Sequence, residues 1–81
     1  MSNNQPVFEI RYGSIKATAW LNQGEHGEYH TVEVSRIYKD SSGEWQRTSS
    51  FRLSDLPKVE KVTADAYRRI YELRAAEAEA A

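Results

Sequence analysis

The chain has 81 residues, with 11 lysines and arginines against 12 aspartates and glutamates, and a formal net charge of −1. This length predicts one small domain, and the absence of cysteine excludes disulfides and thiolate metal sites. The near-zero charge counts against a protein whose whole surface attracts nucleic acid.

Residues 1–6, MSNNQP, form a polar segment that we expect to be a disordered tail ahead of a single domain at residues 7–76. The segment lacks the basic and apolar regions of a signal peptide. No apolar run in the chain approaches the ~20 residues that cross a membrane as a helix. We therefore expect a cytoplasmic protein.

Residues 7–53 are rich in Val, Ile, Thr, Tyr, Phe and Trp with period two, which predicts β-strands. The first segment, VFEIRYG at 7–13, is either a strand of its own or a lead-in that bends at Gly13. In the strand expected at 15–21, successive side chains point to opposite faces. One face of that strand carries Ile15, Ala17, Ala19 and Leu21, and the other carries Lys16, Thr18 and Trp20.

Two turns separate the following strands. The segment 22–29, NQGEHGEY, contains two glycines and predicts a hairpin loop longer than two residues. The segment 39–45, KDSSGEW, supplies Asp, Ser and Gly for a second turn.

The segment after the second turn, EWQRTSSFRL at 44–53, does not alternate cleanly. A break at Ser49-Ser50, as a bulge or short loop, would let the first half face solvent. Under this interpretation Trp45 and Arg47 are exposed, whereas Phe51 and Leu53 belong to the core.

Residues 55–76 predict one helix, with Ser54 as its N-cap and Asp55 in the first turn. One apolar stripe follows steps of three and four residues, at Leu56, Val59, Val62, Ala66, Ile70 and Leu73. Tyr67 and Tyr71 widen the stripe beyond what one small sheet face needs. We therefore predict a homodimer with Tyr67, Ile70 and Tyr71 in its interface. Residues 77–81 offer only small or charged side chains and are expected to fray.

An enzymatic function is not expected. The sequence contains no glycine-rich phosphate loop, no cysteine and no nucleophile-elbow serine motif, and we expect no cofactor. His26 and His30 lie with Glu25 and Glu28 around one hairpin. A metal site needs converging ligands in a supported geometry, so we expect no metal there.

A single helix can cover only one face of the sheet, which leaves the face of Lys16 and Trp20 open. An exposed aromatic in a basic groove can stack a nucleic-acid base, and Trp45 with Arg47 repeats the combination. The alternative is that these aromatics pack under a loop or in a dimer contact, where they bury a large apolar area.

The order of the expected elements along the chain is similar to that of a known protein family. Gly13 precedes the first long strand, and the next strand reads apolar-acid-apolar and ends in Tyr at 32–38. A Gly43-Glu44 turn, a short basic strand and Phe51-Arg52-Leu53-Ser54 then lead into the helix. Over about residues 8–73 this order resembles the transcriptional positive cofactor four family of single-stranded-DNA-binding coactivators. The SR-x-YKD…W segment is also similar to small uncharacterised bacterial and phage proteins.

The resemblance implies an α+β fold, in which four curved antiparallel strands are followed by one C-terminal helix (ββββα), and a homodimer formed through helices and sheet edges. It also implies that single-stranded DNA or RNA lies across the sheet. Mapped by position, the nucleic-acid contacts are Lys16, Trp20, Arg36, Lys39, Trp45 and Arg47.

Two departures from the family leave a second function class open. The family's connection between its third and fourth strands is rich in Lys, Arg and Gly, whereas QRTSSF at 46–51 contains one Arg. The first hairpin is longer and carries Glu25 and Glu28. Because affinity for phosphates scales with cationic contacts, the alternative is a protein-interaction module of the same fold, without nucleic-acid binding, that uses Trp20 and Trp45 as anchors.

Overall fold

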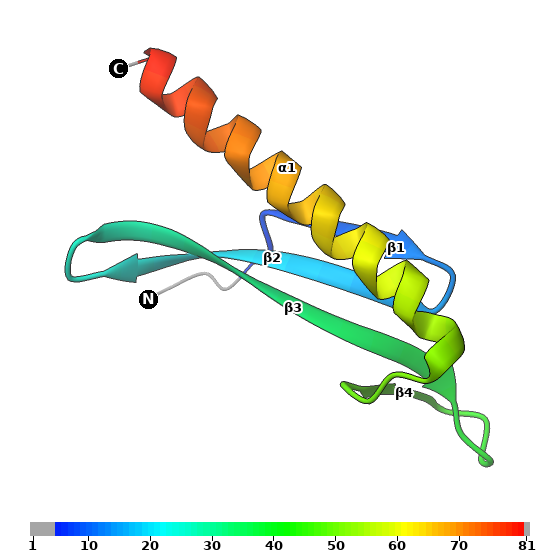
Figure 1. Ribbon diagram of the computed structural model, residues 1–81. Helices are drawn as coiled ribbons and strands as arrows, with labels where there is room; N and C mark the ends of the chain where they lie inside the picture. Colours follow the sequence, from blue (N-terminus) through cyan, green and yellow to red (C-terminus); the bar gives the residue numbers. More distant parts are fainter. Residues whose placement is uncertain (1–4, 81) are drawn as a thin grey trace.

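The computed structural model describes residues 5–80 and contains four strands followed by one long helix (Figure 1). The sheet is antiparallel with the strand order β1-β2-β3-β4, which confirms the predicted ββββα fold. The elements are β1 (Phe8–Tyr12), β2 (Ile15–Gly24), β3 (Gly27–Lys39), β4 (Trp45–Thr48), a 3-10 turn η1 (Leu53–Asp55) and α1 (Leu56–Ala80). Residues 1–4 of the predicted tail and residue 81 lie outside the described residues.

The segment around residues 7–13, which the sequence left open, forms the edge strand β1. Gly13 has a φ of +60°, a left-handed conformation that glycine adopts without steric cost, and it turns the chain directly into β2. The register pairs Tyr12 with Ile15 and Phe8 with Ala19. The tight turn at Gly13 therefore lets residues 8–12 pair antiparallel with β2 as a strand of their own.

The β2–β3 hairpin is tighter than predicted. Gly24 pairs with Gly27, so only residues 25–26 form the turn, and the expectation of a longer loop is wrong. Gly27 has a φ of +115°, which a residue with a Cβ rarely adopts. The two glycines thus let the ladder continue to the tip of the hairpin, where exposed polar side chains follow both strands.

The chain leaves the sheet after Thr48, as the predicted break at Ser49-Ser50 requires. The backbone N–H of Ser50 donates to the Thr48 hydroxyl over 3.1 Å, which turns the chain toward the helix. Phe51 packs against the core, but Leu53 is 85 % exposed. The prediction that Leu53 belongs to the core is wrong, because residues 51–53 form no strand that would point it inward.

The predicted N-cap Ser54 lies inside η1, the 3-10 turn that leads into α1, and the N-cap of that turn is Arg52. The carboxylate of Asp55 accepts the backbone N–H of Arg52 over 2.9 Å, and Asp55 is only 2 % exposed. Pro57 lies in the first turn of α1, where N–H groups have no intrahelical partner. At the other end, α1 continues through Ala80, past residue 76, in keeping with the high helix propensity of Ala and Glu.

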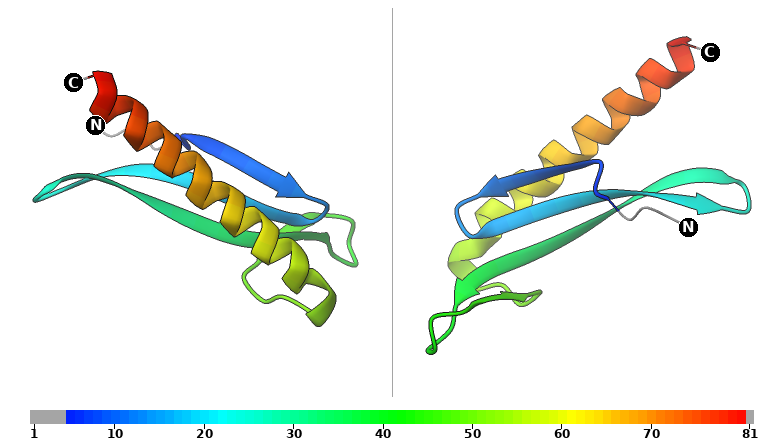
Figure 2. Two further views of the ribbon diagram at one scale, coloured as in Figure 1. Left: turned by 45° about the horizontal axis from the view of Figure 1, so that its top comes forward. Right: turned by 180° about the vertical axis from the view of Figure 1, so that it is seen from behind.

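The core lies where the middle of α1 crosses β2. Its fully buried residues are Ile15, Ala17, Ala19, Val62 and Ala66, and three of these five are alanines. The ends of the predicted helix stripe are not covered, since Leu56 is 48 % and Leu73 is 39 % exposed. Figure 2 shows α1 running diagonally over one face of the sheet and leaving the other face bare. Among residues 5–80, no helix combines the length and the apolar character needed to cross a membrane.

Candidate nucleic-acid interface

The open face of the sheet, opposite α1, is defined by strand alternation. Ile15, Ala17 and Ala19 are buried against α1, so the intervening residues of β2 point away from the helix. The register with β1, β3 and β4 then assigns the other strands. Charged and aromatic side chains of the open face are Glu9, Arg11, Lys16, Trp20, Tyr29, Glu33, Lys39, Trp45 and Arg47.

Trp20 lies partly exposed on β2, and its indole Nε1–H donates to Oε1 of Glu33 over 3.2 Å. Glu33 lies two positions along β3 from Thr31, the direct partner of Trp20, so the contact is a diagonal cross-strand pair. The hydrogen bond restrains the indole against the sheet. It also places a carboxylate beside the ring, which opposes the approach of a phosphate.

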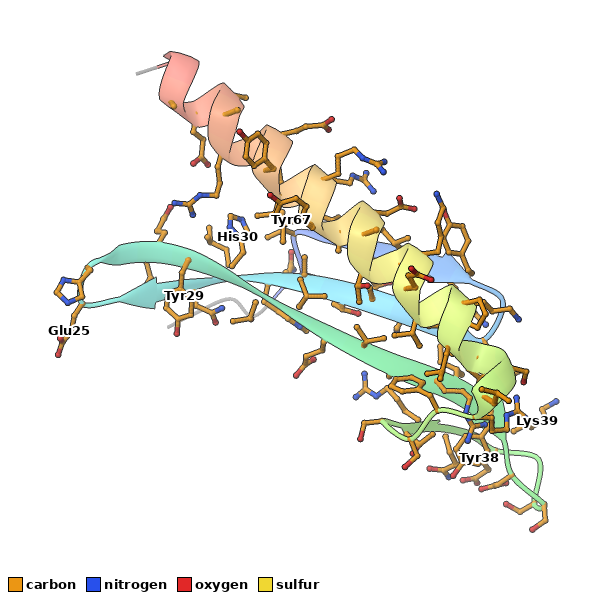
Figure 3. The ribbon with its side chains drawn as sticks, in the orientation of Figure 1. Glu25, Tyr29, His30, Tyr38, Lys39 and Tyr67 are labelled. Atoms are coloured by element: carbon orange, nitrogen blue, oxygen red, sulfur yellow. The ribbon has the colours of Figure 1, made fainter. Side chains whose placement is uncertain are left out.

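The second tryptophan of the open face, Trp45, lies beside the end of β3 and is in contact with a cation. Lys39 pairs in register with Trp45, its ammonium lies 5.4 Å from the indole centroid, and Trp45 is 64 % exposed. Arg47 follows on the same face, opposite Ile37. Figure 3 shows Lys39 at the far end of β3 from the hairpin tip that carries Glu25.

The turn that joins β3 to β4 is held by Asp40. Its Oδ1 accepts the backbone N–H groups of Glu44 (2.9 Å) and Ser42 (3.0 Å), and its Oδ2 accepts the side-chain amide of Gln46 (3.0 Å). The hydrogen bond from Glu44, followed by that from the Ser42 hydroxyl, lowers the pKa of Asp40 below its usual range. The charged carboxylate therefore fixes the register in which Lys39 faces Trp45.

A shallow depression of about 380 Å³ lies on the open face between the two tryptophans. It is lined by Thr18, Glu33, Val34, Ser35, Arg47, Thr48 and Ser49. Lys16 stands at its side, where its ammonium lies 3.8 Å from Glu9. Both signs of charge therefore meet here, with Arg47 as the cation that lines the depression.

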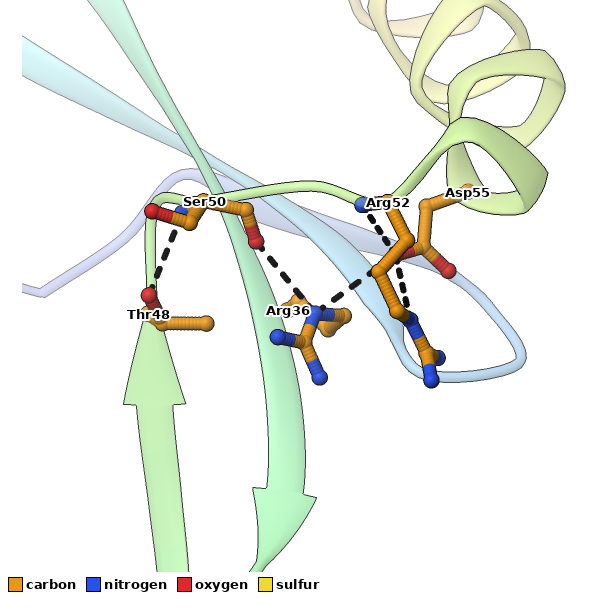
Figure 4. A network of polar contacts seen from close by, with 5 residues as sticks. All are labelled: Arg36, Thr48, Ser50, Arg52 and Asp55. Atoms are coloured by element: carbon orange, nitrogen blue, oxygen red, sulfur yellow. Dashed lines mark hydrogen bonds and ion pairs between the residues drawn. The ribbon is translucent and has the colours of Figure 1, made fainter.

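Arg36 is the one predicted contact that the structure separates from the others. It pairs with Ile15 and so points to the helix side, where its Nε donates to the Ser50 carbonyl (3.3 Å) and lies 3.5 Å from Asp55 (Figure 4). Its guanidinium also lies 5.3 Å from the Tyr38 ring centroid. Counting by two from Val32 and Val34 would have placed Arg36 on this face.

The Asp55 carboxylate joins Arg36 to the start of the helix. Arg52 also contacts it, with 3.3 Å between Nε and Oδ2. The hydrogen bonds from the backbone and side chain of Arg52 lower the pKa of Asp55, against the opposing effect of its burial. Arg36 is thus part of the joint between β3, the segment after β4, and α1.

The predicted dimer residues divide between two environments. Ile70 is partly buried, whereas Tyr67 and Tyr71 are 70 % and 64 % exposed, with their ring centroids 6.2 Å apart.

Figure 3 shows His30 projecting from β3 on the side of the sheet where α1 lies. Within residues 5–80, no group of three potential ligands among His, Cys, Asp and Glu is placed to hold a metal ion.

Sequence reasoning missed two features of the open face. The segment that became β1 was left undecided, so Glu9 and Arg11 were not considered, although their alternation with Phe8 and Ile10 was visible. The Trp20–Glu33 hydrogen bond depends on the register of β2 against β3, which no local pattern specifies.

Comparison with known proteins finds no match to this chain among family models, curated proteins or solved structures.

Proposed function

We propose that the open face of the sheet binds single-stranded nucleic acid, and that the protein acts as a homodimer without a catalytic step. The observation that carries the proposal is that two tryptophans share one face with cations: Lys39 contacts Trp45 and Arg47 follows it, while Lys16 lies four residues from Trp20 on β2. Stacking on an exposed aromatic is worth about 1–3 kcal/mol per base and tolerates any sequence.

The spacing of the two tryptophans suits an extended strand. The register partners of Trp20 and Trp45 on β3 are Thr31 and Lys39, which are eight residues apart. At about 3.3 Å per residue they are separated by about 26 Å. A single strand that stacks one base on each indole would cross the depression lined by Arg47 and leave several nucleotides between them.

The charge balance predicts modest affinity. The charged strand residues of the open face are four cations, Arg11, Lys16, Lys39 and Arg47, against two anions, Glu9 and Glu33. Each phosphate neutralised releases counterions, so binding should weaken as salt rises. With so few cations, that dependence should be shallow compared with strongly basic proteins.

The homodimer is supported by how little the single chain buries. Its radius of gyration is 15.0 Å, against about 12 Å for a compact domain of this length. Among the residues that the structure describes, five hydrophobic residues are buried, while Tyr29, Tyr67, Tyr71 and nine other large apolar side chains are exposed. Small domains with so little core commonly gain burial by association.

The second candidate is a protein-interaction module that uses the same face. The carboxylate of Glu33 beside Trp20 favours it, because aromatic anchors with polar neighbours also form protein hot spots. Both candidates place Trp20 and Trp45 at the contact, so they differ in partner and not in surface.

Titration of the tryptophan fluorescence with single-stranded oligonucleotides separates the two candidates. Nucleic-acid binding predicts saturable quenching that weakens between low and moderate salt. A homopolymer and a mixed sequence should bind similarly, since stacking is sequence-tolerant. No fluorescence change at low salt would reject the proposal in favour of the protein-interaction module.

A further inference from the structure

The strand β1 lies at an edge of the sheet. No strand among residues 5–80 pairs with its outer side, and its five residues, FEIRY, include no proline. An edge of this kind presents free N–H and C=O groups to a further strand. Which groups are free decides what can pair with it.

The hydrogen bonds at the start of β2 show which of its backbone N–H and C=O groups point toward β3 and which point toward β1. The N–H of Ile37 donates to the carbonyl of Ser14 over 2.8 Å. Hydrogen-bonded and non-hydrogen-bonded pairs alternate along an antiparallel ladder, so the backbone groups of Ile15 point away from β3 and toward β1. The same holds for every second residue up to Ala19, whose carbonyl accepts the N–H of Val7 over 2.8 Å.

The register with β2 then shows which backbone groups of β1 are bonded to β2 and which are free. Tyr12, Ile10 and Phe8 are the partners of the β2 residues whose backbone groups point toward β1, so they form the β1–β2 hydrogen bonds. The N–H and C=O groups of Glu9 and Arg11 therefore point to the free edge.

The sequence of β1 is complementary to itself when read in the opposite direction. If two copies of β1 pair antiparallel with Ile10 opposite Ile10, Glu9 of each copy faces Arg11 of the other, and Phe8 faces Tyr12. The Glu9–Arg11 positions are the ones whose backbone groups are free, so they form the hydrogen-bonded pairs. Opposite charges and aromatic pairs across strands are the combinations that stabilise a sheet.

We propose that a second copy of this chain pairs with β1 edge to edge about a two-fold axis at Ile10, so that two sheets join into one. The inference rests on the homodimer of the proposed function and places its contact on β1, not on Tyr67, Ile70 and Tyr71. The two open faces then become one continuous surface that carries the tryptophans and cations of both copies.

The side of α1 above this edge carries both signs of charge. A hollow of about 450 Å³ between β1 and α1 is lined by Ile10 and Tyr12 and by the charged residues Lys61, Asp65, Arg68, Arg69 and Glu72. Asp65 already pairs with Lys61 (3.6 Å) and Arg68 (3.4 Å) within the chain. Because this rim carries both signs of charge, a second copy that approaches it does not meet a block of like charge.

Charge exchange across the edge tests the proposal. Four samples are compared by light scattering after size exclusion at micromolar concentration: the parent, Glu9→Arg, Arg11→Glu and the double variant. Circular dichroism confirms that each is folded. Each single variant places like charges opposite each other at both ends of the contact, whereas the double variant restores opposite charges.

The parent and the double variant should elute as dimers. Each single variant should shift toward the monomer mass, because the dissociation constant of its dimer should rise at least tenfold. An equimolar mixture of the two single variants should recover the dimer mass, because a chain with two arginines then faces one with two glutamates. Amide hydrogen exchange of Glu9 and Arg11 should be slow in the parent dimer and fast in the single variants. Glu9→Gln and Arg11→Gln, which remove attraction without adding repulsion, should have smaller effects and serve if a charge-reversed chain does not fold.

Single variants that remain dimers, or a mixture that stays monomeric, would overturn the edge contact. If Tyr71→Glu makes the protein monomeric while Glu9→Arg leaves it dimeric, the dimer interface lies on the helix and not on β1. Oligonucleotide titration of the same samples is scored separately, so a lost dimer with retained quenching leaves the nucleic-acid proposal standing. A dimer that binds no oligonucleotide leaves the edge contact standing.

Discussion

Tyr12 donates its hydroxyl to Oδ2 of Asp65 over 2.6 Å, and this hydrogen bond joins the edge strand β1 to the middle of α1. The two residues are 53 positions apart in the chain. The hydrogen bond from Tyr12 is the main cause of a lowered pKa at Asp65, while the same contact raises the pKa of Tyr12. The ionised carboxylate and the neutral phenol are thus the forms that hold β1 under the helix.

Tyr12→Phe should lower the melting temperature at neutral pH, because it removes the donor to a charged acceptor. The folded pKa of Asp65 lies below its unfolded value of about 4, so its contribution to stability is present above that value and is lost as pH falls through the folded pKa. The melting difference between parent and variant should therefore shrink on acidification. Thermal melts at neutral and strongly acidic pH test this, with Tyr71→Phe as an exposed control. A difference that is constant with pH would contradict the role of Asp65.

Ile15→Ala should destabilise the protein by about 2–5 kcal/mol, the range for truncating a buried isoleucine. Ile15 is fully buried in the contact between β2 and α1. Leu53→Ala is the matched control, since its side chain is 85 % exposed and surface changes usually stay within about 0.5 kcal/mol. Denaturant unfolding measures both. Equal losses would mean that the core does not lie where α1 crosses β2.

Trp20→Ala should weaken binding of single-stranded DNA by roughly five- to hundredfold, which corresponds to the loss of one stacked base. Trp20→Phe is the control, because it retains an aromatic face while losing the indole N–H that donates to Glu33. Fluorescence of the remaining Trp45 reports binding in both variants. Equal weakening by the two substitutions would show that the Glu33 contact, and not stacking, is what matters.

Arg47→Ala and Arg36→Ala form a pair that distinguishes the two faces. Arg47 lies on the open face, so its loss should lower affinity for every sequence and reduce the salt slope by about one unit. Arg36 contacts Asp55 and the Ser50 carbonyl, so its loss should lower the melting temperature and leave the slope unchanged. Binding isotherms at several salt concentrations, with thermal melts, separate these effects. The reverse pattern would place the nucleic acid on the helix side.

Glu33→Gln should raise affinity for single-stranded DNA. The substitution removes a negative charge from the open face. The amide oxygen of the introduced glutamine can still accept the hydrogen bond from the Trp20 indole N–H, which in the parent joins Nε1 to Oε1 of Glu33 over 3.2 Å. The gain should be largest at low salt, where repulsion between the carboxylate and a phosphate is least screened. Titration of parent and variant under the same conditions measures it. Lower affinity in the variant would favour the protein-interaction module, in which the carboxylate contacts the partner.

The sequence by itself determined the features that depend on local periodicity. Alternation over residues 15–21 separated Ile15 and Ala17 from Lys16 and Trp20, and steps of three and four placed Val62 and Ala66 on the inner side of one helix. These patterns are readable because a strand and a helix each repeat their side-chain directions over a few residues. The break after Thr48 followed from the same local signals, whereas the local pattern left the first strand open and the four-stranded ββββα order was implied by the family resemblance.

Tertiary structure alone decided which partners those elements meet. Arg36 became part of the helix joint because Asp55, 19 positions away in the chain, is buried beside it, and Leu53 became exposed because the chain had already left the sheet. Ser54 lies inside the 3-10 turn η1, whose N-cap Arg52 donates its backbone N–H to Asp55, and Glu33 lies against Trp20 through the β2–β3 register. The reason is physical: register and burial depend on contacts between segments far apart in the chain, and a local pattern specifies the directions of side chains but not what lies opposite them.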